Sequence, residues 1–336
     1  MNQNVNFIRA LALLGVYQNA RTEYGINVSQ FSIPPSVFKN SMNLLPVNEM
    51  CIWLKELEQL TQDPDVILKM ASKVDLDKVG SIGHWFFSGH DLASTIRRIN
   101  MGVGCLQSGA HLTGAQVGHL MKWNYRNTAV DSDVKVHDSI RVAVLLTKVL
   151  RRYLGESYAP TRVMLQGSRD NQKLYEHYFG CEVVWNHSKT EVWLRSDLML
   201  ASNQQETNSK TQLAMGFSDL DVFMNMPNPN DHHKVIYEMI KYSCHYGLPT
   251  LARVSTLLGL SEQQFQRRLQ NLGMNFTTVM GYVLSNSAVD LMRHSVPLNE
   301  VASRLGYTNL ASFNRMFKKH RGLTPKQYIE RFRLSG

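Results

Sequence analysis

The sequence predicts a mainly α-helical protein with a small β component, built as two domains joined by a linker. Three observations predict this class. Apolar residues recur at three and four positions over long stretches, short apolar runs with turn residues fill one limited region, and the last 105 residues contain an internal repeat. With 336 residues, of which 43% are hydrophobic, the chain can bury more than one core.

Helices dominate the expected N-terminal domain. The apolar run over 7–17 predicts a first amphipathic helix, because it contains Arg9 and no basic residue precedes it, which argues against a signal peptide. The apolar residues of 46–71 and 138–154 recur with helical spacing. We therefore expect core-facing helices over both stretches.

The region between Pro160 and Asp197 has a different pattern. Short apolar runs occupy 162–166 and 183–185, and another follows over 190–194 after the turn-prone residues Asn186-His187-Ser188. These runs predict a small sheet with a hairpin, which makes the N-terminal domain mixed α/β.

A linker is expected over 202–231, because its first part lacks strongly apolar side chains and its last part carries Pro227 and Pro229. The predicted domains are therefore 1–201 and 232–336. Residues 1–231 hold 22 basic and 22 acidic residues, whereas the rest of the chain holds 14 basic and 5 acidic ones. The net charge of +9 thus lies in the C-terminal domain, which indicates that this domain meets a polyanion.

Two similar helix pairs follow one another in the C-terminal domain. The corresponding residues are Val254 and Val301, Leu258 and Leu305, Gly259 and Gly306, Phe265 and Phe313, Arg267 and Arg315, and Leu269 and Phe317. Each unit has a short helix, a glycine suited to a left-handed backbone, a Ser or Thr that can cap the next helix, and a second helix. This order predicts an all-α domain with two helix-turn-helix units, at about 250–272 and 298–320. A helical repeat used only for packing is the alternative.

The second helix of each unit has a polar face with almost no acidic residues. The apolar stripes are expected to be Phe265, Leu269 and Leu272 in the first unit and Leu310, Phe313 and Phe317 in the second. Amide and guanidinium groups distinguish bases in the major groove, and Lys and Arg near the helix end suit phosphates. The predicted DNA-contacting residues are Gln263, Gln264, Arg267, Arg268, Asn309, Ser312, Asn314, Arg315, Lys318 and Lys319.

A linker helix is expected between the units, over 276–293, where apolar residues recur with helical spacing. Such a helix would be roughly 25 Å long at ~1.5 Å per residue. It could place the two units about one DNA turn apart, roughly 34 Å, on the same face of the duplex.

The second unit resembles the C-terminal signature of the AraC/XylS transcription regulators. The residues that carry the resemblance are Gly306-Tyr307, Ser312-Phe313, Arg315, Phe317-Lys318-Lys319, Gly322, Thr324-Pro325 and Tyr328, with Ala288, Leu291 and Met292 in the preceding helix. The resemblance extends from Thr250 to the C-terminus. It implies a sequence-specific transcription regulator, most often an activator, that binds promoter double-stranded DNA and recruits RNA polymerase.

The N-terminal part is similar, more loosely, to the effector domain of the branch that includes ornithine-utilisation and mycobacterial virulence regulators. Gly83-His84-Trp85-Phe86 and Tyr178-Phe179-Gly180-Cys181-Glu182-Val183 carry this resemblance. It implies a domain that binds a small-molecule effector or holds a homodimer. The domain does not resemble the cupin domain of sugar-sensing members, because its helices precede a late, short hairpin.

An apolar pocket in the N-terminal part is a further hypothesis, with ordinary core packing as the alternative. The side chains that suggest it are Trp85, Phe86, Phe87, Met101, Met121 and Trp123. The adjacent Arg97 and Arg98 suggest a carboxylate effector, such as a fatty acid or an amino acid.

Other sites and locations receive little support from the sequence. The four cysteines lie far apart without a C-x-x-C pair, as in a cytoplasmic protein with reduced thiols. The apolar run over 142–150 is too short to cross a membrane, and the histidines lack metal-site spacing, so we expect no membrane segment, metal or cofactor. Two alternatives to a regulator stay open: a non-specific architectural DNA-binding protein, and an enzyme with a nucleic-acid-anchoring tail.

Overall fold

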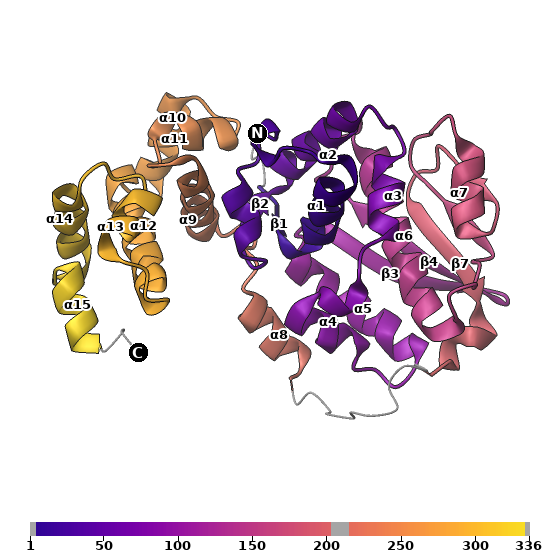
Figure 1. The fold of residues 1–336 in the computed structure, drawn as a ribbon. Coiled ribbons are helices and arrows are strands. Elements are labelled where there is room, and N and C mark those ends of the chain that lie inside the picture. The colour runs from indigo at the N-terminus through magenta and orange to yellow at the C-terminus, as the bar shows by residue number, and fades with distance from the viewer. Residues whose placement is uncertain (1–4, 203–214, 333–336) are drawn as a thin grey trace. The chain divides into compact units, whose positions relative to one another are not determined.

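The chain divides after Met226 into two units, each with its own core. The computed structural model describes residues 5–202 and 215–332 (Figure 1). No helix within these ranges is both long and apolar enough to cross a membrane. The N-terminal unit mixes helices with a sheet, and the C-terminal unit is helical throughout its described residues, so the predicted fold class is confirmed.

The N-terminal unit begins at β1 and ends with α8. Its strands are β1 (Phe7–Arg9), β2 (Leu44–Pro46), β3 (Ala110–Val117), β4 (Leu120–Asn127), β5 (Arg162–Met164), β6 (Val183–Val184) and β7 (Thr190–Arg195). Its α-helices are α1 (Leu11–Tyr24), α2 (Val47–Thr61), α3 (Val66–Ser72), α4 (Gly80–Phe87), α5 (Leu92–Leu106), α6 (Lys135–Leu154), α7 (Gln172–Phe179) and α8 (Phe217–Met224). Short 3-10 turns occupy Val28–Gln30, Pro35–Lys39, Leu76–Lys78 and Ser196–Leu200.

One five-stranded sheet forms the centre of this unit, in the order β3-β4-β7-β5-β6. The β5–β6 pair is parallel and the other pairs are antiparallel. Helix α5 packs on β3, and α6 packs on β7. This open mixed sheet differs from the double-sheet jelly roll of a cupin domain.

The predicted hairpin is wrong in its position. Strand β6 pairs in parallel with β5, whereas β7 pairs with β4 and β5, because this register places Val192 and Leu194 in the core. The hairpin of the sheet is β3–β4, which turns at Gly118 with a φ of 59°. Most β3 side chains are exposed, so this strand has no apolar run from which the sequence could have predicted it.

The predicted N-terminal helices are partly divided. Residues Phe7–Arg9 form β1, which pairs with β2, and the first helix starts only at Leu11. The stretch over 46–71 is broken into α2 and α3 around Pro64, because proline cannot continue a helix hydrogen-bond ladder. Helix α6 covers the remaining predicted helix.

Part of the predicted linker folds onto the N-terminal unit. Residues 203–214 of that linker lie outside the described residues. Helix α8 packs on α5, with Leu220 and Met224 buried, and the indole of Trp85 donates to the carbonyl of Met215 at 3.0 Å. The stretch before this helix has few apolar residues, so the sequence pattern did not predict that Leu220 and Met224 are buried.

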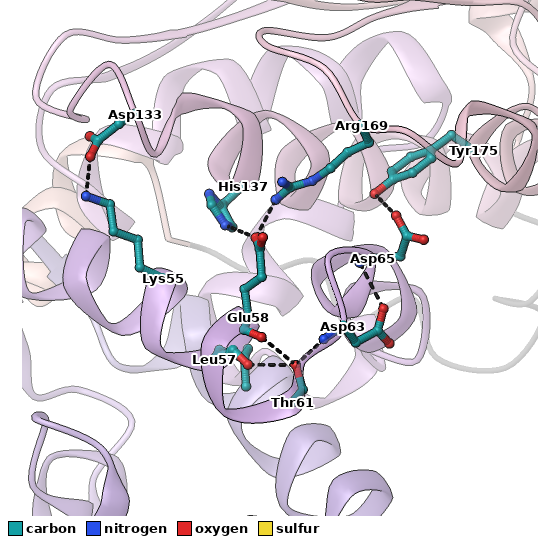
Figure 2. Close-up of polar contacts among 10 residues, drawn as sticks. All are labelled: Lys55, Leu57, Glu58, Thr61, Asp63, Asp65, Asp133, His137, Arg169 and Tyr175. Carbon is teal, nitrogen blue, oxygen red and sulfur yellow. Dashed lines mark hydrogen bonds and ion pairs between the residues drawn. The ribbon is translucent and has the colours of Figure 1, made fainter.

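A polar network ties α2 to α6 and to the segment before α7 (Figure 2). The carboxylate of Glu58 lies 2.5 Å from Nε2 of His137 and 2.7 Å from the guanidinium of Arg169. Nearby, the Tyr175 hydroxyl donates to Asp65 at 2.8 Å. These buried and partly buried polar groups join α2, α6 and the segment around α7.

The C-terminal unit contains seven α-helices within its described residues. They are α9 (His232–Ser243), α10 (Leu251–Leu257), α11 (Glu262–Asn271), α12 (Phe276–Arg293), α13 (Leu298–Arg304), α14 (Leu310–Arg321) and α15 (Pro325–Phe332), with a 3-10 turn at Cys244–Tyr246. Helix α12 has the predicted bounds, and it packs against α9, α13 and α14. It therefore belongs to the core of the second helix pair, and it touches the first pair where the rings of Phe276 and Phe265 lie 6.2 Å apart.

Candidate nucleic-acid interface

The two helix pairs of the C-terminal unit turn in the same way. Gly259 follows α10 with a φ of 64°, and Gly306 follows α13 with a φ of 84°. In both turns the next residue donates a backbone hydrogen bond of 2.9 Å back to the helix, from Leu260 to Ser255 and from Tyr307 to Ala302. The left-handed glycines predicted from the repeat are confirmed, and they turn the chain into the second helix of each pair.

Side-chain caps begin the second helices. Ser261 accepts from the backbone of Gln264 at 3.2 Å, and the side-chain oxygen of Gln264 accepts from the backbone of Ser261 at 2.9 Å. The side-chain oxygen of Asn309 accepts from the backbone of Ser312 at 2.8 Å. In two of the predicted DNA-contacting residues, Gln264 and Asn309, the side-chain oxygen thus accepts a backbone hydrogen bond at the start of its own helix.

The apolar stripes match the prediction with one exception. Phe265, Leu269, Phe313 and Phe317 are buried, and Leu272 is partly buried. Leu310 was predicted to be buried and is 36% exposed, because it is the first residue of α14 and lies before the first buried turn.

On α11 the predicted residues separate into exposed and tethered groups. Gln263 and Arg267 are exposed, and neither has a hydrogen-bond or ion-pair partner among the described residues. Arg268 is partly buried, and its Nη2 lies 2.9 Å from Nδ1 of His232 at the start of α9. Arg268 is therefore turned towards the domain, and Gln263 and Arg267 towards solvent.

On α14 the cations dominate. Arg315, Lys318 and Lys319 are exposed, and the helix carries no Asp or Glu. The guanidinium of Arg315 donates to the Ser312 hydroxyl at 3.2 Å, which holds both side chains on one face. Asn314 is partly buried, so it is less available than its neighbours.

A hollow between α13 and the start of α14 contains residues beyond the predicted contacts. It is lined by Asn299, Ser303, Tyr307, Thr308, Asn309 and Leu310. Only Asn309 of these was singled out as a contact. The others belong to α13, to the turn or, for Leu310, to the first position of α14, and they come together only because the two helices pack.

Two family profiles match the chain. Residues 254–331 match a helix-turn-helix domain, and residues 28–202, just over half of the chain, match the N-terminal arabinose-binding domain of the AraC transcription regulator. The chain belongs to the AraC family of transcription regulators. The predicted resemblance to the AraC/XylS regulators is confirmed.

Individual relatives of this AraC-family chain match mainly its C-terminal part. An uncharacterised HTH-type transcriptional regulator of Mycobacterium tuberculosis is 34% identical over 84 residues, which are 25% of this chain and 24% of the relative. The HTH-type transcriptional activator CsvR of Escherichia coli is 31% identical over 85 residues, which are 25% of this chain and 32% of the relative. The chain thus covers about a quarter to a third of these relatives.

A solved structure aligns over more of the chain. The transcriptional regulator CdpR of Pseudomonas aeruginosa is 18% identical, with a TM-score of 0.46, over 94% of this chain and 96% of that chain.

The N-terminal domain of this AraC-family chain contains a mainly apolar cavity of about 150 Å³. Phe86 and Phe87 line it, as the pocket hypothesis expected. Trp85, Met101, Met121 and Trp123 do not line it; the Trp123 indole, for example, is buried and donates to Asn100 at 2.8 Å. The suggested Arg97 and Arg98 are also absent from its lining, and the arginine that lines it is Arg141.

The cysteines carry no nucleophile ready for catalysis. All four are free, and burial raises the pKa of Cys51, Cys105 and Cys181 to about 11 and that of Cys244 to about 12. These thiols stay protonated at neutral pH, whereas a catalytic cysteine needs a thiolate.

Proposed function

We propose that this chain is a sequence-specific transcription regulator that binds promoter double-stranded DNA in the cytoplasm through both helix-turn-helix units. One observation carries the proposal: each second helix follows a glycine turn and presents to solvent a face of amides and cations, with no acidic residue on α14 and only Glu262 on α11. A solvated helix usually mixes both signs, because opposite charges four residues apart attract each other. A one-signed face suits the phosphates of DNA.

The proposed contacts fall into three groups. Gln263, Arg267 and Arg315 contact base edges, because their amide and guanidinium groups are exposed and can pair with bases. Lys318 and Lys319 contact phosphates near the end of α14. The remaining predicted residues support these contacts: Gln264, Asn309 and Ser312 at the helix starts, Arg268 through its partner on α9, and Asn314 beside them.

Helix α12 supports simultaneous binding by the two units. Its 18 residues extend over about 27 Å, close to the roughly 34 Å of one DNA turn. We propose that the units enter successive major grooves on one face of the duplex, where the protein acts as an activator that recruits RNA polymerase.

The N-terminal domain is proposed to control this binding. A small-molecule effector in its cavity would change the population of the DNA-binding state only if it binds one state more tightly than the other. The same domain is proposed to hold a homodimer.

Footprinting with competition tests the proposal. The full-length protein should protect a segment upstream of its own gene, and should bind this segment at least ~10³-fold more tightly than bulk DNA. Equal affinity for both would support the architectural alternative and contradict the proposal. Turnover of a substrate by a protein that protects no promoter would favour the enzyme alternative.

A further inference from the structure

The cavity of the N-terminal domain is lined by α1, α4, α5, α6, the segment before α4 and the β3–β4 hairpin. Its volume is about 150 Å³. The buried aliphatic and phenylalanine side chains of its lining are Phe86, Phe87, Ile99, Leu112, Val142, Leu146 and Val149. Ala12, Val103 and Leu145 also line it and are partly buried. An apolar cavity of this size accepts a molecule about as large as benzene.

Three polar residues also line this cavity: Gln107, Tyr125 and Arg141. They are linked through Asp138. One Asp138 oxygen accepts from Nη2 of Arg141 at 2.6 Å, and the other accepts from the Tyr125 hydroxyl at 2.7 Å. The same Arg141 Nη2 also donates to the side-chain oxygen of Gln107 at 3.1 Å.

Two hydrogen-bond donors of this cluster lack an acceptor within the described residues. They are Nε of Arg141 and Nε2 of Gln107, both buried. The two residues are only 3% and 4% exposed. Buried donors are nearly always paired, because an unpaired one loses its bonds to water without replacement. Two such donors on the wall of one cavity indicate a ligand atom that accepts hydrogen bonds.

The charge of the cluster indicates what kind of acceptor fits. Asp138 balances Arg141, and both are buried, so the site has no net charge to neutralise an anion. A carboxylate would bring an unpaired charge into a buried apolar space, which is unfavourable. Arg98 does not change this balance, because its guanidinium stacks over Trp85 at 5.0 Å and does not line the cavity. An uncharged oxygen satisfies the donors without this cost.

We propose that the cavity binds a compact, uncharged, apolar molecule with one carbonyl oxygen, which accepts hydrogen bonds from Arg141 and Gln107. The apolar body of the ligand fills the space between Phe86 and Leu146. That this ligand is the effector of the regulator rests on the proposed function. The binding itself needs no DNA.

Calorimetric titration of the full-length protein with three probes of similar shape tests the proposal. Cyclohexanone has the body and the carbonyl, methylenecyclohexane has the body without an acceptor, and cyclohexanecarboxylate carries a charge. Cyclohexanone should bind about tenfold more tightly than methylenecyclohexane, since hydrogen bonds to a charged donor distinguish them. Cyclohexanecarboxylate should bind more weakly than cyclohexanone.

Binding measurements on variants of α5 and of Gln107, which follows it, test whether the ligand occupies this cavity. Val103→Phe should fill part of the cavity and weaken cyclohexanone binding at least about tenfold, whereas Met101→Phe, on the same helix but 47% exposed and outside the lining, should leave it unchanged. Gln107→Leu should remove one donor and bring the affinities for cyclohexanone and methylenecyclohexane close together.

Three results would overturn the inference. They are no heat from cyclohexanone, equal binding of cyclohexanone and methylenecyclohexane by the unmodified protein, and tighter binding of cyclohexanecarboxylate. Failure to protect a promoter would overturn the proposed function and leave this inference standing, because the titration contains no DNA.

Discussion

The two domains use charge in opposite ways. The N-terminal domain buries charged side chains, among them Asp65, Asp138, Arg141 and Glu191, and links them into networks. In the C-terminal domain the buried polar side chains of the described residues are three serines, and the ion pairs there are exposed. Charge thus organises the interior of the neutral domain, whereas in the basic domain it is available to a partner.

The largest expected change in stability follows from a substitution at Asp138. Asp138→Asn leaves the Arg141 guanidinium buried without its counter-charge, so the free energy of unfolding should fall by about 3–5 kcal/mol. All five tryptophans precede residue 194, so their fluorescence during urea unfolding reports the N-terminal domain. The control, Glu300→Gln, breaks an exposed pair with Arg304 and should cost less than about 1 kcal/mol by circular dichroism. Equal costs would mean that burial of charge does not distinguish the domains.

The C-terminal domain should instead be sensitive to its close backbone packing. At Gly306 an added Cβ would lie 2.3 Å from the backbone nitrogen of Leu248, and φ is 84°. Gly306→Ala should therefore lower the free energy of unfolding by about 3 kcal/mol, measured by circular dichroism, without a change in the tryptophan transition. At Gly322 φ is 76° with open space around it, so Gly322→Ala should cost only about 1 kcal/mol. A Gly306→Ala variant as stable as the unmodified protein would show that the turn tolerates a side chain.

Adjacent arginines on α11 test which cations face the partner. Arg267→Ala should weaken binding to the cognate promoter by about 1–3 kcal/mol, because an exposed guanidinium is lost from the proposed base contact. Arg268→Ala should change DNA affinity less and destabilise the domain more, because Arg268 contacts His232. Fluorescence anisotropy with cognate and scrambled duplexes separates the two, and the reverse ranking would contradict the assignment.

Acid should destabilise the N-terminal domain through His137. Burial and the Arg169 cation lower its pKa below the ordinary value, against the opposing effect of Glu58. The unfolded chain, with a His pKa of about 6.5, therefore binds a proton that the folded chain does not. The free energy of unfolding should fall as the pH drops from 7 to 5, by up to about 1.4 kcal/mol per pH unit.

His137→Gln should flatten this pH dependence when unfolding is followed by tryptophan fluorescence. The C-terminal domain supplies the control, because burial lowers the pKa of His245 to about 4 and its own acid sensitivity should persist in the variant. An unchanged slope in the tryptophan transition would exclude His137 as its source.

The smallest expected effect concerns the lysines of α14. Lys318→Ala should weaken binding to all sequences alike and reduce the salt slope of binding by about 1, since one phosphate contact is lost. The affinity measured between 50 and 200 mM salt on cognate and scrambled duplexes checks this. A loss confined to the cognate duplex would place Lys318 at a base.

Local patterns alone determined most of the C-terminal domain. The glycine turns, the bounds of α12 and the buried Phe265, Phe313 and Phe317 follow from helical spacing and backbone preference, which depend on neighbours in the chain. The one-signed charge of this domain was also visible in composition. The residues that carry the family resemblance are also close together in the sequence, so they could be identified without the structure.

Only the tertiary structure decided the rest. The pairing of β7 with β4 and β5, the docking of α8 and the separation of Arg267 from Arg268 depend on elements that are distant in sequence. The cavity beside Arg141 is the clearest case, because its lining comes from four helices and a hairpin that no single periodicity connects. Long-range packing, and not local preference, sets which buried donors find a partner.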